Sequence, residues 1–258
     1  MGTEGAPAGL LEDFAIRGSG NHERIGILLV HGFTGSPSSM RSWAEFFAAR
    51  GYSVRVPRLP GHATQWQDLN RVSWQEWPAR IELELDELHK SCDHVFIFGL
   101  SMGGGTTLYV TAHHGDKVSG IVLVNPMIHM PGAKATLLPV MSRLKSHLPS
   151  VGNDIKRPNV SEYGYDALPL KGLAQLGKFL KITRKTLDLV KVPMMLFHSV
   201  EDHVLPVTNT EIIMAEVGSQ SKQRIELVNS YHVATLDYDA DVIFENSLVF
   251  VQELSKTL

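Results

Sequence analysis

The chain has 258 residues, 43% of them hydrophobic and 20% charged, with a formal net charge of -3 at pH 7. This size and apolar content are typical of one globular domain with a substantial core, so we expect residues 1–258 to form a single domain. The weak negative charge does not indicate binding to nucleic acid or to an anionic membrane. No apolar run approaches the roughly 18 residues of a membrane span, so we expect no transmembrane segment.

The N-terminus and the cysteine content bear on cellular location. The first stretch, "MGTEGAPAGLLEDFAIRGSG", lacks the basic start and the apolar run of a secretory signal peptide. The single cysteine, Cys92, cannot form an internal disulfide. We therefore expect a cytoplasmic protein. Composition does not indicate an oligomeric state.

Six short and nearly continuous apolar runs predict β-strands that are covered on both faces. In chain order they occupy residues 24–32, 52–57, 94–99, 119–125, 192–199 and 224–230. Stretches with helical periodicity, such as residues 36–51 and 73–90, lie between them. This alternation predicts an α/β fold with a mostly parallel central sheet and helices on both of its faces.

One interval interrupts the alternation. Residues 126–190 contain no strand-like run and are far more numerous than an ordinary crossover needs. Two apolar stripes with helical spacing lie there, one formed by Leu137, Leu138, Met141, Leu144 and Leu148, the other by Leu173, Leu176 and Leu180. We interpret the interval as a cap insertion over the carboxyl edge of the sheet, and we expect at least half of the stripe residues to close the core.

The strand at residues 94–99 runs into the pattern Gly99-x-Ser101-x-Gly103, which is the spacing of a nucleophile elbow. Small residues are needed there because the backbones of strand and helix nearly touch. Ser101 is therefore a candidate nucleophile, although the five-residue pattern alone fits an ordinary glycine-rich turn equally well. Gly105 lowers helix stability by about 1 kcal/mol relative to alanine and has no evident purpose in the sequence.

A serine nucleophile needs a base that accepts its proton and an acid that orients this base. In the elbow fold these follow in the order Ser, Asp or Glu, then His, on loops after later strands. Asp202 follows the strand at residues 192–199, and His232 follows the strand at residues 224–230. Glu201 and Asp237 are alternative candidates for the acid. Asp202 is favoured because of its position in the sequence.

Acyl transfer also needs two fixed hydrogen-bond donors for an oxyanion. We expect the backbone amide of Met102, directly after the nucleophile, and that of Phe33, in the glycine-rich loop "HGFTG". The side chains of five other histidines receive no chemical role: His62, His113, His114, His198 and His203. Because no Cys, His or carboxylate spacing indicates a zinc site, we expect no metal and no organic cofactor.

Four segments together carry a family resemblance. "HGFTG", "GLSMGG", "VEDHVLP" and "NSYHVATLDYD", in this order and over nearly the full length, resemble the bacterial monoacylglycerol lipases and their carboxylesterase relatives of the α/β hydrolase superfamily. The resemblance implies an α/β-hydrolase fold and a serine hydrolase that cleaves monoacylglycerols to glycerol and free fatty acid through an acyl-enzyme. It also implies that Ser101, Asp202 and His232 are catalytic, with the amides of Phe33 and Met102 in the oxyanion hole.

The insertion resembles the cap segment of the same family. By this resemblance Glu162 accepts hydrogen bonds from the glycerol hydroxyls of the substrate, and Val151 lines the path of the acyl chain. Sequence alone would favour a solvated surface role for Glu162. An apolar cap is also compatible with transient contact with lipid aggregates.

Two other functions remain open at this point. The first is a carboxylesterase that acts on short- to medium-chain simple esters, because such relatives share the serine and histidine motifs and differ mainly in the cap. The second, more remote, is a non-catalytic ligand-binding protein that keeps the hydrolase fold.

Overall fold

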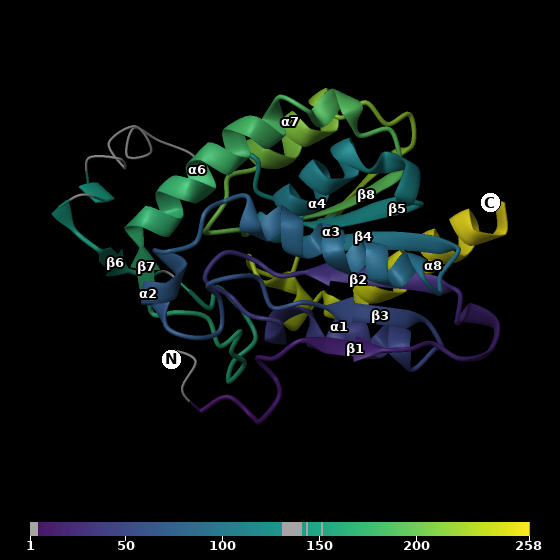
Figure 1. Cartoon of the computed structure of the whole chain (residues 1–258), viewed down its shortest axis with the longest axis horizontal. Coiled ribbons are helices and arrows are strands. Elements are labelled where there is room, and N and C mark those ends of the chain that lie inside the picture. Colours follow the sequence, from purple (N-terminus) through teal and green to yellow (C-terminus); the bar gives the residue numbers. More distant parts are fainter. Residues whose placement is uncertain (1–4, 131–140, 143, 151, 258) are drawn as a thin grey trace.

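The structure is a computed structural model that describes residues 5–130, 141–142, 144–150 and 152–257. Its central sheet has seven strands in the order β1-β3-β2-β4-β5-β8-β9 (Figure 1). All neighbouring strands are parallel except β1, which runs antiparallel to β3. The strands are β1 (Phe14–Ile16), β2 (Ile25–Val30), β3 (Ser53–Val56), β4 (His94–Leu100), β5 (Gly120–Val124), β8 (Met194–Ser199) and β9 (Lys222–Leu227).

The predicted mostly parallel sheet is confirmed, and each of the six apolar runs forms one of its strands. The central strands β4, β5 and β8 are almost entirely buried, which is why they appear in the sequence as continuous apolar runs. Strand β1 was not predicted because its three apolar residues are too few to form a recognisable run. The register pairs Val30 with Gly99 and Leu100 with Val124, so the carboxyl ends of the central strands meet at one edge.

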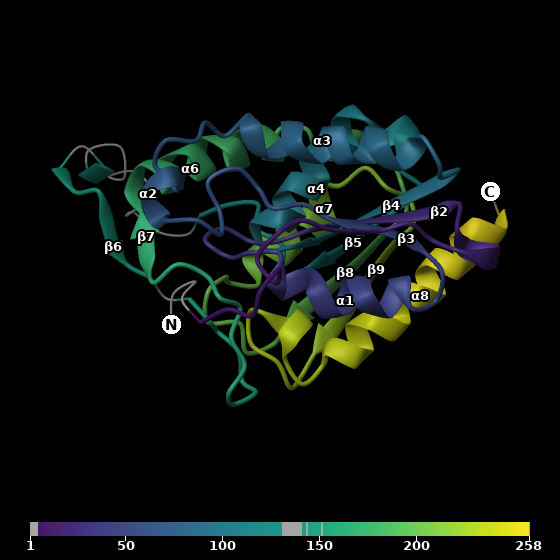
Figure 2. The ribbon, with the colours of Figure 1, turned by 60° about the horizontal axis from the view of Figure 1, so that its bottom comes forward.

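Helices cover both faces of the sheet and enclose two separate cores. On one face lie α1 (Ser38–Ala48) and α8 (Ala240–Thr257), and on the other lie α3 (Glu76–His89), α4 (Met102–His113) and α6 (Leu170–Arg184) (Figure 2). Alternate residues of one strand contribute to different cores: Leu28 belongs to the core under α3 and α4, whereas Ile27 belongs to the core under α1 and α8. Two shorter helices are α2 (Trp66–Leu69) and α7 (Thr208–Glu216).

The interval interpreted as an insertion carries α6 and a small antiparallel sheet of β6 (His147–Pro149) and β7 (Ala167–Pro169). Figure 1 shows these elements together with α2 at one end of the molecule. The stripe of Leu173, Leu176 and Leu180 lies on α6, where Leu176 and Leu180 are buried. None of the helices in the described part of the chain is long and apolar enough to cross a membrane.

The other predicted stripe is wrong over its second half. Leu148 lies in β6 rather than in a helix, and Leu144 is 80% exposed. The cause is local, because the residue before a proline disfavours helical dihedrals and Pro149 follows Leu148 directly. The expectation of no strand in this interval is wrong as well, since β6 and β7 are too short to produce a pattern. Leu137 and Leu138 lie outside the described residues.

Candidate active site

Ser101 lies at the turn between β4 and α4, with φ 56° and ψ -119°, a conformation that residues with a side chain rarely adopt. The turn is possible because its neighbours are glycines. A Cβ on Gly103 would lie 2.1 Å from the carbonyl oxygen of Val30, and one on Gly99 would lie 2.5 Å from that of Gly103. The backbone amide of Ser101 donates to Val124 O at 3.0 Å, which ties the turn to the next strand.

Gly105 has a purpose that the sequence did not reveal. A Cβ there would lie 2.6 Å from the carbonyl oxygen of Met127, because the chain leaving β5 crosses the first turn of α4. In the same crossing, Met127 N donates to Ser101 O at 2.9 Å. Glycine is therefore required at this position, despite its lower helix propensity, because a side chain would collide with the crossing segment.

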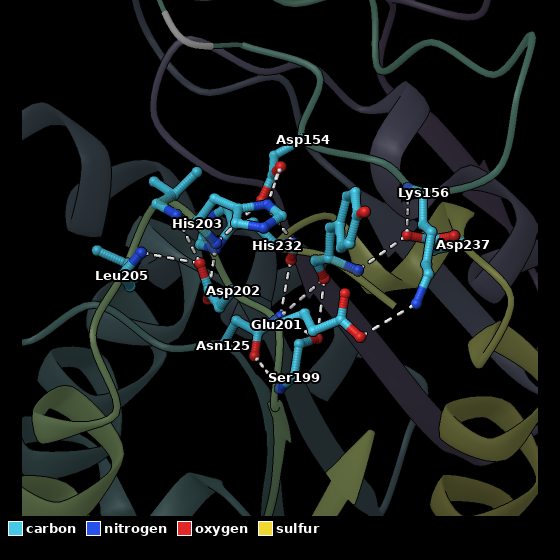
Figure 3. A network of polar contacts seen from close by, with 12 residues as sticks. Asn125, Asp154, Lys156, Ser199, Glu201, Asp202, His203, Leu205, His232 and Asp237 are labelled. Carbon is cyan, nitrogen blue, oxygen red and sulfur yellow. Dashed lines mark hydrogen bonds and ion pairs between the residues drawn. The ribbon is translucent and has the colours of Figure 1, made fainter. Parts of the chain in front are cut away.

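Asp202 and His232 come from different strands and meet as a buried pair. Asp202 follows β8 and His232 follows β9, and His232 Nδ1 lies 2.8 Å from Asp202 Oδ2. The other carboxylate oxygen, Oδ1, accepts the amides of Val204 and Leu205, each at 2.8 Å. Figure 3 shows this pair at the centre of a wider polar network. Because the amides hold one side of the carboxylate, its other oxygen is aimed at the imidazole.

The charges of the pair are mutually stabilised. Burial lowers the pKa of His232, but the hydrogen bond and charge of Asp202, with the charges of Glu162 and Asp154, outweigh it and raise that pKa. Burial likewise raises the pKa of Asp202, but His232 and the two amides outweigh it and lower that pKa. Asp202 therefore stays ionised, and the imidazole of His232 accepts a proton more readily than a free histidine does.

Ser101 and His232 line the same cavity, which has a volume of about 350 Å³. Within the described residues, Ser101 Oγ makes no hydrogen bond to His232, a frequent situation in enzymes without bound substrate. His232 Nδ1 is held by Asp202, so Nε2 is the ring nitrogen that remains to accept a proton. The three predicted residues of the triad thus come together at one edge of the sheet, with their roles still a prediction.

The two predicted oxyanion donors also lie at this cavity. Met102 is the first residue of α4, and in the described part of the chain neither its amide nor that of Phe33 donates a hydrogen bond to the protein. A Cβ on Gly32, the residue before Phe33, would be 3.7 Å from Ser101 Oγ, so this loop passes directly beside the serine. Two unpaired amides near one hydroxyl are what an oxyanion site requires.

His31 supports this loop, and sequence reasoning gave it no role. Leu59 N donates to His31 Nε2 at 3.2 Å, so Nδ1 carries the proton and donates to Gly32 O at 2.9 Å. Burial lowers the pKa of His31 to about 4, which keeps the ring neutral and preserves this tautomer. Its position directly after β2 was the signal in the sequence.

The alternative acids are used elsewhere. Glu201 forms an ion pair with Lys156 at 3.2 Å. The carboxylate of Asp237 instead accepts backbone amides, those of Lys156, Arg157, Tyr231 and Tyr238. Neither forms a hydrogen bond or an ion pair with His232 within the described residues.

The histidines without an assigned role have other partners. His203 bonds Asp154, His198 lies beside Thr210, and His62 packs against His31. His113 Nδ1 contacts the carbonyl of Tyr109, and His114 lies 3.4 Å from Glu82. In the part of the chain that the structure describes, no three His, Cys, Asp or Glu side chains are grouped as a metal site would require.

Glu162 lines the same cavity as Ser101 and is half-buried. Its Oε1 accepts the amide of Asn153 at 2.9 Å, whereas Oε2 accepts no hydrogen bond from the described residues. Withdrawal from water raises the pKa of Glu162, against the opposing effects of Asn153 and His232. Glu162 therefore lies at the wall of this cavity, and its role stays a prediction. Val151 lies outside the described residues.

Asn125 is a second residue that the motifs missed. It has φ 43° directly after β5, and its Oδ1 accepts the amide of Ser199 at 2.7 Å. Its Nδ2 donates to His232 O at 2.8 Å (Figure 3). Asn125 therefore joins the ends of two strands to the loop that carries His232. A polar residue at the end of the run "SGIVLVN" was the available signal.

Comparisons with known proteins agree with this architecture. The family model described as serine aminopeptidase, S33, matches residues 21–239. A thermostable monoacylglycerol lipase of Bacillus sp. (strain H-257) is 43% identical over 226 residues, which cover 88% of this chain and 90% of the relative. A carboxylesterase of Bacillus subtilis (strain 168) is 23% identical, with 88% of this chain and 92% of the relative covered.

A solved structure has the same fold as this chain. It comes from work on LipS and LipT, two metagenome-derived lipolytic enzymes, and its sequence is 38% identical to this chain. The superposition has a TM-score of 0.90 and covers 95% of this chain and 98% of that chain. The predicted α/β-hydrolase fold is thereby confirmed.

Proposed function

Since the chain belongs to the serine aminopeptidase S33 family of α/β hydrolases, we propose that it hydrolyses monoacylglycerols to glycerol and free fatty acid. One observation carries the choice of substrate: Glu162 Oε2, with no partner among the described residues, lines the cavity that also contains Ser101. A carboxylate oxygen accepts hydrogen bonds from the hydroxyls of a glycerol group. The 43% identical relative is itself a monoacylglycerol lipase, which supports the proposal.

The rest of the cavity wall suits an acyl chain. Its apolar side chains include Met127, Met130, Leu168, Leu173 and Leu176. Burial of each methylene group there contributes about 0.8 kcal/mol. Flexible methionines adapt to chains of different shape. A substrate with a polar head and one apolar tail therefore matches both parts of the cavity.

The mechanism follows from the positions of the side chains. Neutral His232 takes the proton of Ser101 Oγ at Nε2 while this oxygen attacks the ester carbonyl carbon. The amides of Phe33 and Met102 donate to the oxyanion that forms. The C–O bond to glycerol then breaks, and the leaving oxygen takes the proton from His232 Nε2.

Deacylation repeats the same steps with water. His232 removes a proton from a water molecule, which attacks the acyl carbon, and Ser101 Oγ leaves with the returned proton. Asp202 keeps Nδ1 protonated and stabilises the imidazolium in both steps. These residues suffice for the reaction, so the mechanism requires no metal or organic cofactor.

Replacement of the nucleophile tests the reaction class. We expect Ser101→Ala to lose monoacylglycerol hydrolysis and labelling by a serine-directed phosphonate. The side chain has no hydrogen bond among the described residues, so the variant should keep its melting temperature. Retained turnover in the variant would remove the assignment, and an unlabelled wild-type protein would favour a ligand-binding protein instead.

Glu162 tests the choice of substrate. Hydrogen bonds to a charged group are worth about 1.5–3 kcal/mol, so Glu162→Gln should lower kcat/KM for a monoacylglycerol about 10- to 100-fold. Hydrolysis of a p-nitrophenyl ester of the same acyl chain should change less than threefold, because it has no glycerol hydroxyls. Equal losses on the two substrates would refute a role in glycerol recognition.

A carboxylesterase for short- to medium-chain simple esters is the second candidate, and the 23% identical carboxylesterase supports it. A substrate panel separates the two proposals. We expect a higher kcat/KM for monoacylglycerols than for ethyl esters of the same acid, and little hydrolysis of di- and triacylglycerols. A preference for the ethyl esters would favour the second candidate.

We also infer a cytoplasmic location and transient contact of the cap with lipid aggregates. Cys92 is buried and unpaired, which supports a reducing compartment. A second cavity of about 670 Å³ adjoins α6 and shares Met130 with the site, and its wall carries basic side chains: Arg71, Lys171, Lys178, Lys181 and Arg184. The same wall includes apolar side chains such as Val72, Ile128 and Leu180, and a surface with basic and apolar side chains suits an anionic aggregate. Activity that stays unchanged across the aggregation threshold of the substrate would contradict this contact.

A further inference from the structure

Asp154 belongs to the cap insertion, yet its carboxylate reaches the loops of both the acid and the base. Its side chain is 13% exposed. Oδ1 bonds the ring of His203 at Nδ1 (2.9 Å), and Oδ2 accepts the amides of His203 (3.3 Å) and His232 (3.1 Å). The carbonyl of Asp154 also accepts the amide of Val233 at 3.0 Å. Figure 3 shows Asp154 bridging His203 and His232.

The bridge joins two segments that must be aligned for catalysis. His203 follows Asp202 directly on the loop after β8, and His232 lies on the loop after β9. The side chains of Asp202 and His232 touch, but the backbones of their loops belong to different strands. A carboxylate that accepts amides from both loops fixes one backbone relative to the other.

We propose that Asp154 is a positioning residue of the active site, which holds the loops of Asp202 and His232 in register from the cap insertion. The proposal rests on the proposed function only in taking Ser101, His232 and Asp202 as the reacting groups. It does not depend on the choice of monoacylglycerol as substrate.

The charge of Asp154 has a second effect. Three carboxylates act on the His232 ring: Asp202 from the loop after β8, and Glu162 and Asp154 from the insertion. Each of them favours the imidazolium that forms during the reaction. Removal of the Asp154 charge should therefore lower the pH at which the base becomes protonated, whereas removal of its hydrogen bonds should misalign the base.

The neighbouring residue connects the same segment to the substrate side of the cavity. Asn153 donates its amide to Glu162 Oε1 at 2.9 Å, and its Oδ1 accepts the amide of Glu162 at 2.8 Å. Consecutive residues thus hold Glu162 on one side and His232 on the other. Asn153→Gly, which tolerates the observed φ of 65°, should mainly impair monoacylglycerol binding. Asp154 variants should impair every ester.

The experiment compares Asp154→Ala and Asp154→Asn with the wild type on p-nitrophenyl butyrate over a range of pH. A phosphonate titration counts the competent sites, so kcat is expressed per labelled serine. Asp166→Asn is the matched control, because it removes an exposed acid from the same insertion whose side chain makes no hydrogen bond among the described residues. We expect this control to match the wild type in kcat and in pH profile.

We expect Asp154→Ala to lower the plateau kcat at least tenfold, as small misplacements of a reacting group do. Asp154→Asn keeps an acceptor oxygen, so it should recover the plateau kcat to within threefold, with the acid limb of the profile displaced to lower pH. A loss below fivefold per labelled serine in Asp154→Ala would overturn the proposal. The proposal would also be overturned if Asp154→Ala had fewer labelled serines but an unchanged kcat per labelled serine. That result would indicate a purely structural role.

Two further outcomes are decisive. If Asp154→Ala does not fold, Asp154→Glu takes its place, because its longer side chain keeps the charge but displaces the carboxylate from the amides of His203 and His232. A loss below fivefold in kcat per labelled serine in Asp154→Glu then overturns the proposal, and a larger loss supports it. If the wild type hydrolyses p-nitrophenyl butyrate but not monoacylglycerols, the proposed substrate fails while the result for Asp154 stands.

Discussion

Replacement of Asp202 by asparagine should nearly abolish activity without unfolding the protein. The amides of Val204 and Leu205 both donate to Oδ1, so the single oxygen of the asparagine is held on that side. Its NH₂ group must then face His232 Nδ1, where the carboxylate oxygen lies at 2.8 Å in the native pair. An NH₂ group donates only, so Nδ1 becomes the acceptor and the ring proton moves to Nε2.

This tautomer cannot accept the proton of Ser101. The corresponding substitution in another serine hydrolase lowers kcat about 10⁴-fold by the same change of tautomer. We expect a similar loss here, equivalent to about 5.4 kcal/mol of activation free energy. The fold should persist, because the asparagine oxygen still accepts the two amides.

The assay is kcat for p-nitrophenyl butyrate at the pH plateau, with circular dichroism and the melting temperature as checks on folding. Glu201→Gln is the matched control, since it neutralises the adjacent acid, which pairs only with Lys156 among the described residues. We expect this control to stay within twofold of the wild type. A folded Asp202→Asn variant that loses less than tenfold in kcat would refute the assigned tautomer and the role of Asp202.

Three other predictions follow from burial and close contacts. Because the pKa of His232 is raised and its neutral form is the base, kcat/KM should fall as the pH drops through a value above 6.5, and a half-maximum below 6.5 would contradict this reasoning. Gly105→Ala should lower the free energy of unfolding by about 1–3 kcal/mol, since its Cβ would lie 2.6 Å from Met127 O. Gly115→Ala, with no atom within 4 Å of the added Cβ, is the control, and an equal melting temperature for both variants would refute the contact. Burial lowers the pKa of His31 to about 4. As the pH falls, His31 is therefore protonated in the unfolded chain at a higher pH than in the native protein. The contribution of His31 to the free energy of unfolding should therefore fall by about 3 kcal/mol between pH 6.5 and pH 4. We compare denaturant series of the wild type and His31→Gln over this range, and an equal pH dependence in the two proteins would contradict the buried neutral state.

The two apolar stripes of residues 126–190 illustrate where pattern reasoning succeeds and where it fails. The stripe on α6 packs on the core, so the spacing of its leucines follows the buried face of the helix. The helix could therefore be predicted from the sequence. The preceding stripe ends in β6, whose pairing with Ala167–Pro169 decides its conformation. Three-residue strands leave no periodicity, so only the proline after Leu148 could have warned against a helix.

The candidate site divides in the same way. Ser101, Asp202 and His232 could be selected because each follows a strand in the order typical of the elbow fold. The supporting residues His31, Asn125 and Asp154 could not, because their bonds join segments that are distant in the sequence. The spacing of residues in the sequence does not indicate which distant residues become hydrogen-bond partners in the folded protein.

The sequence by itself determined the parallel sheet, the elbow and the order of the candidate reacting groups. Buried strands and sharp turns require particular residue types locally, so these features can be recognised from a short stretch of sequence. Only the tertiary structure decided which acid meets His232, why Gly105 must lack a side chain, and which oxygen of Glu162 stays unpaired in the cavity. These features depend on distances of a few ångströms between segments from different strands. Such distances result from the packing of the whole chain rather than from any one stretch of it.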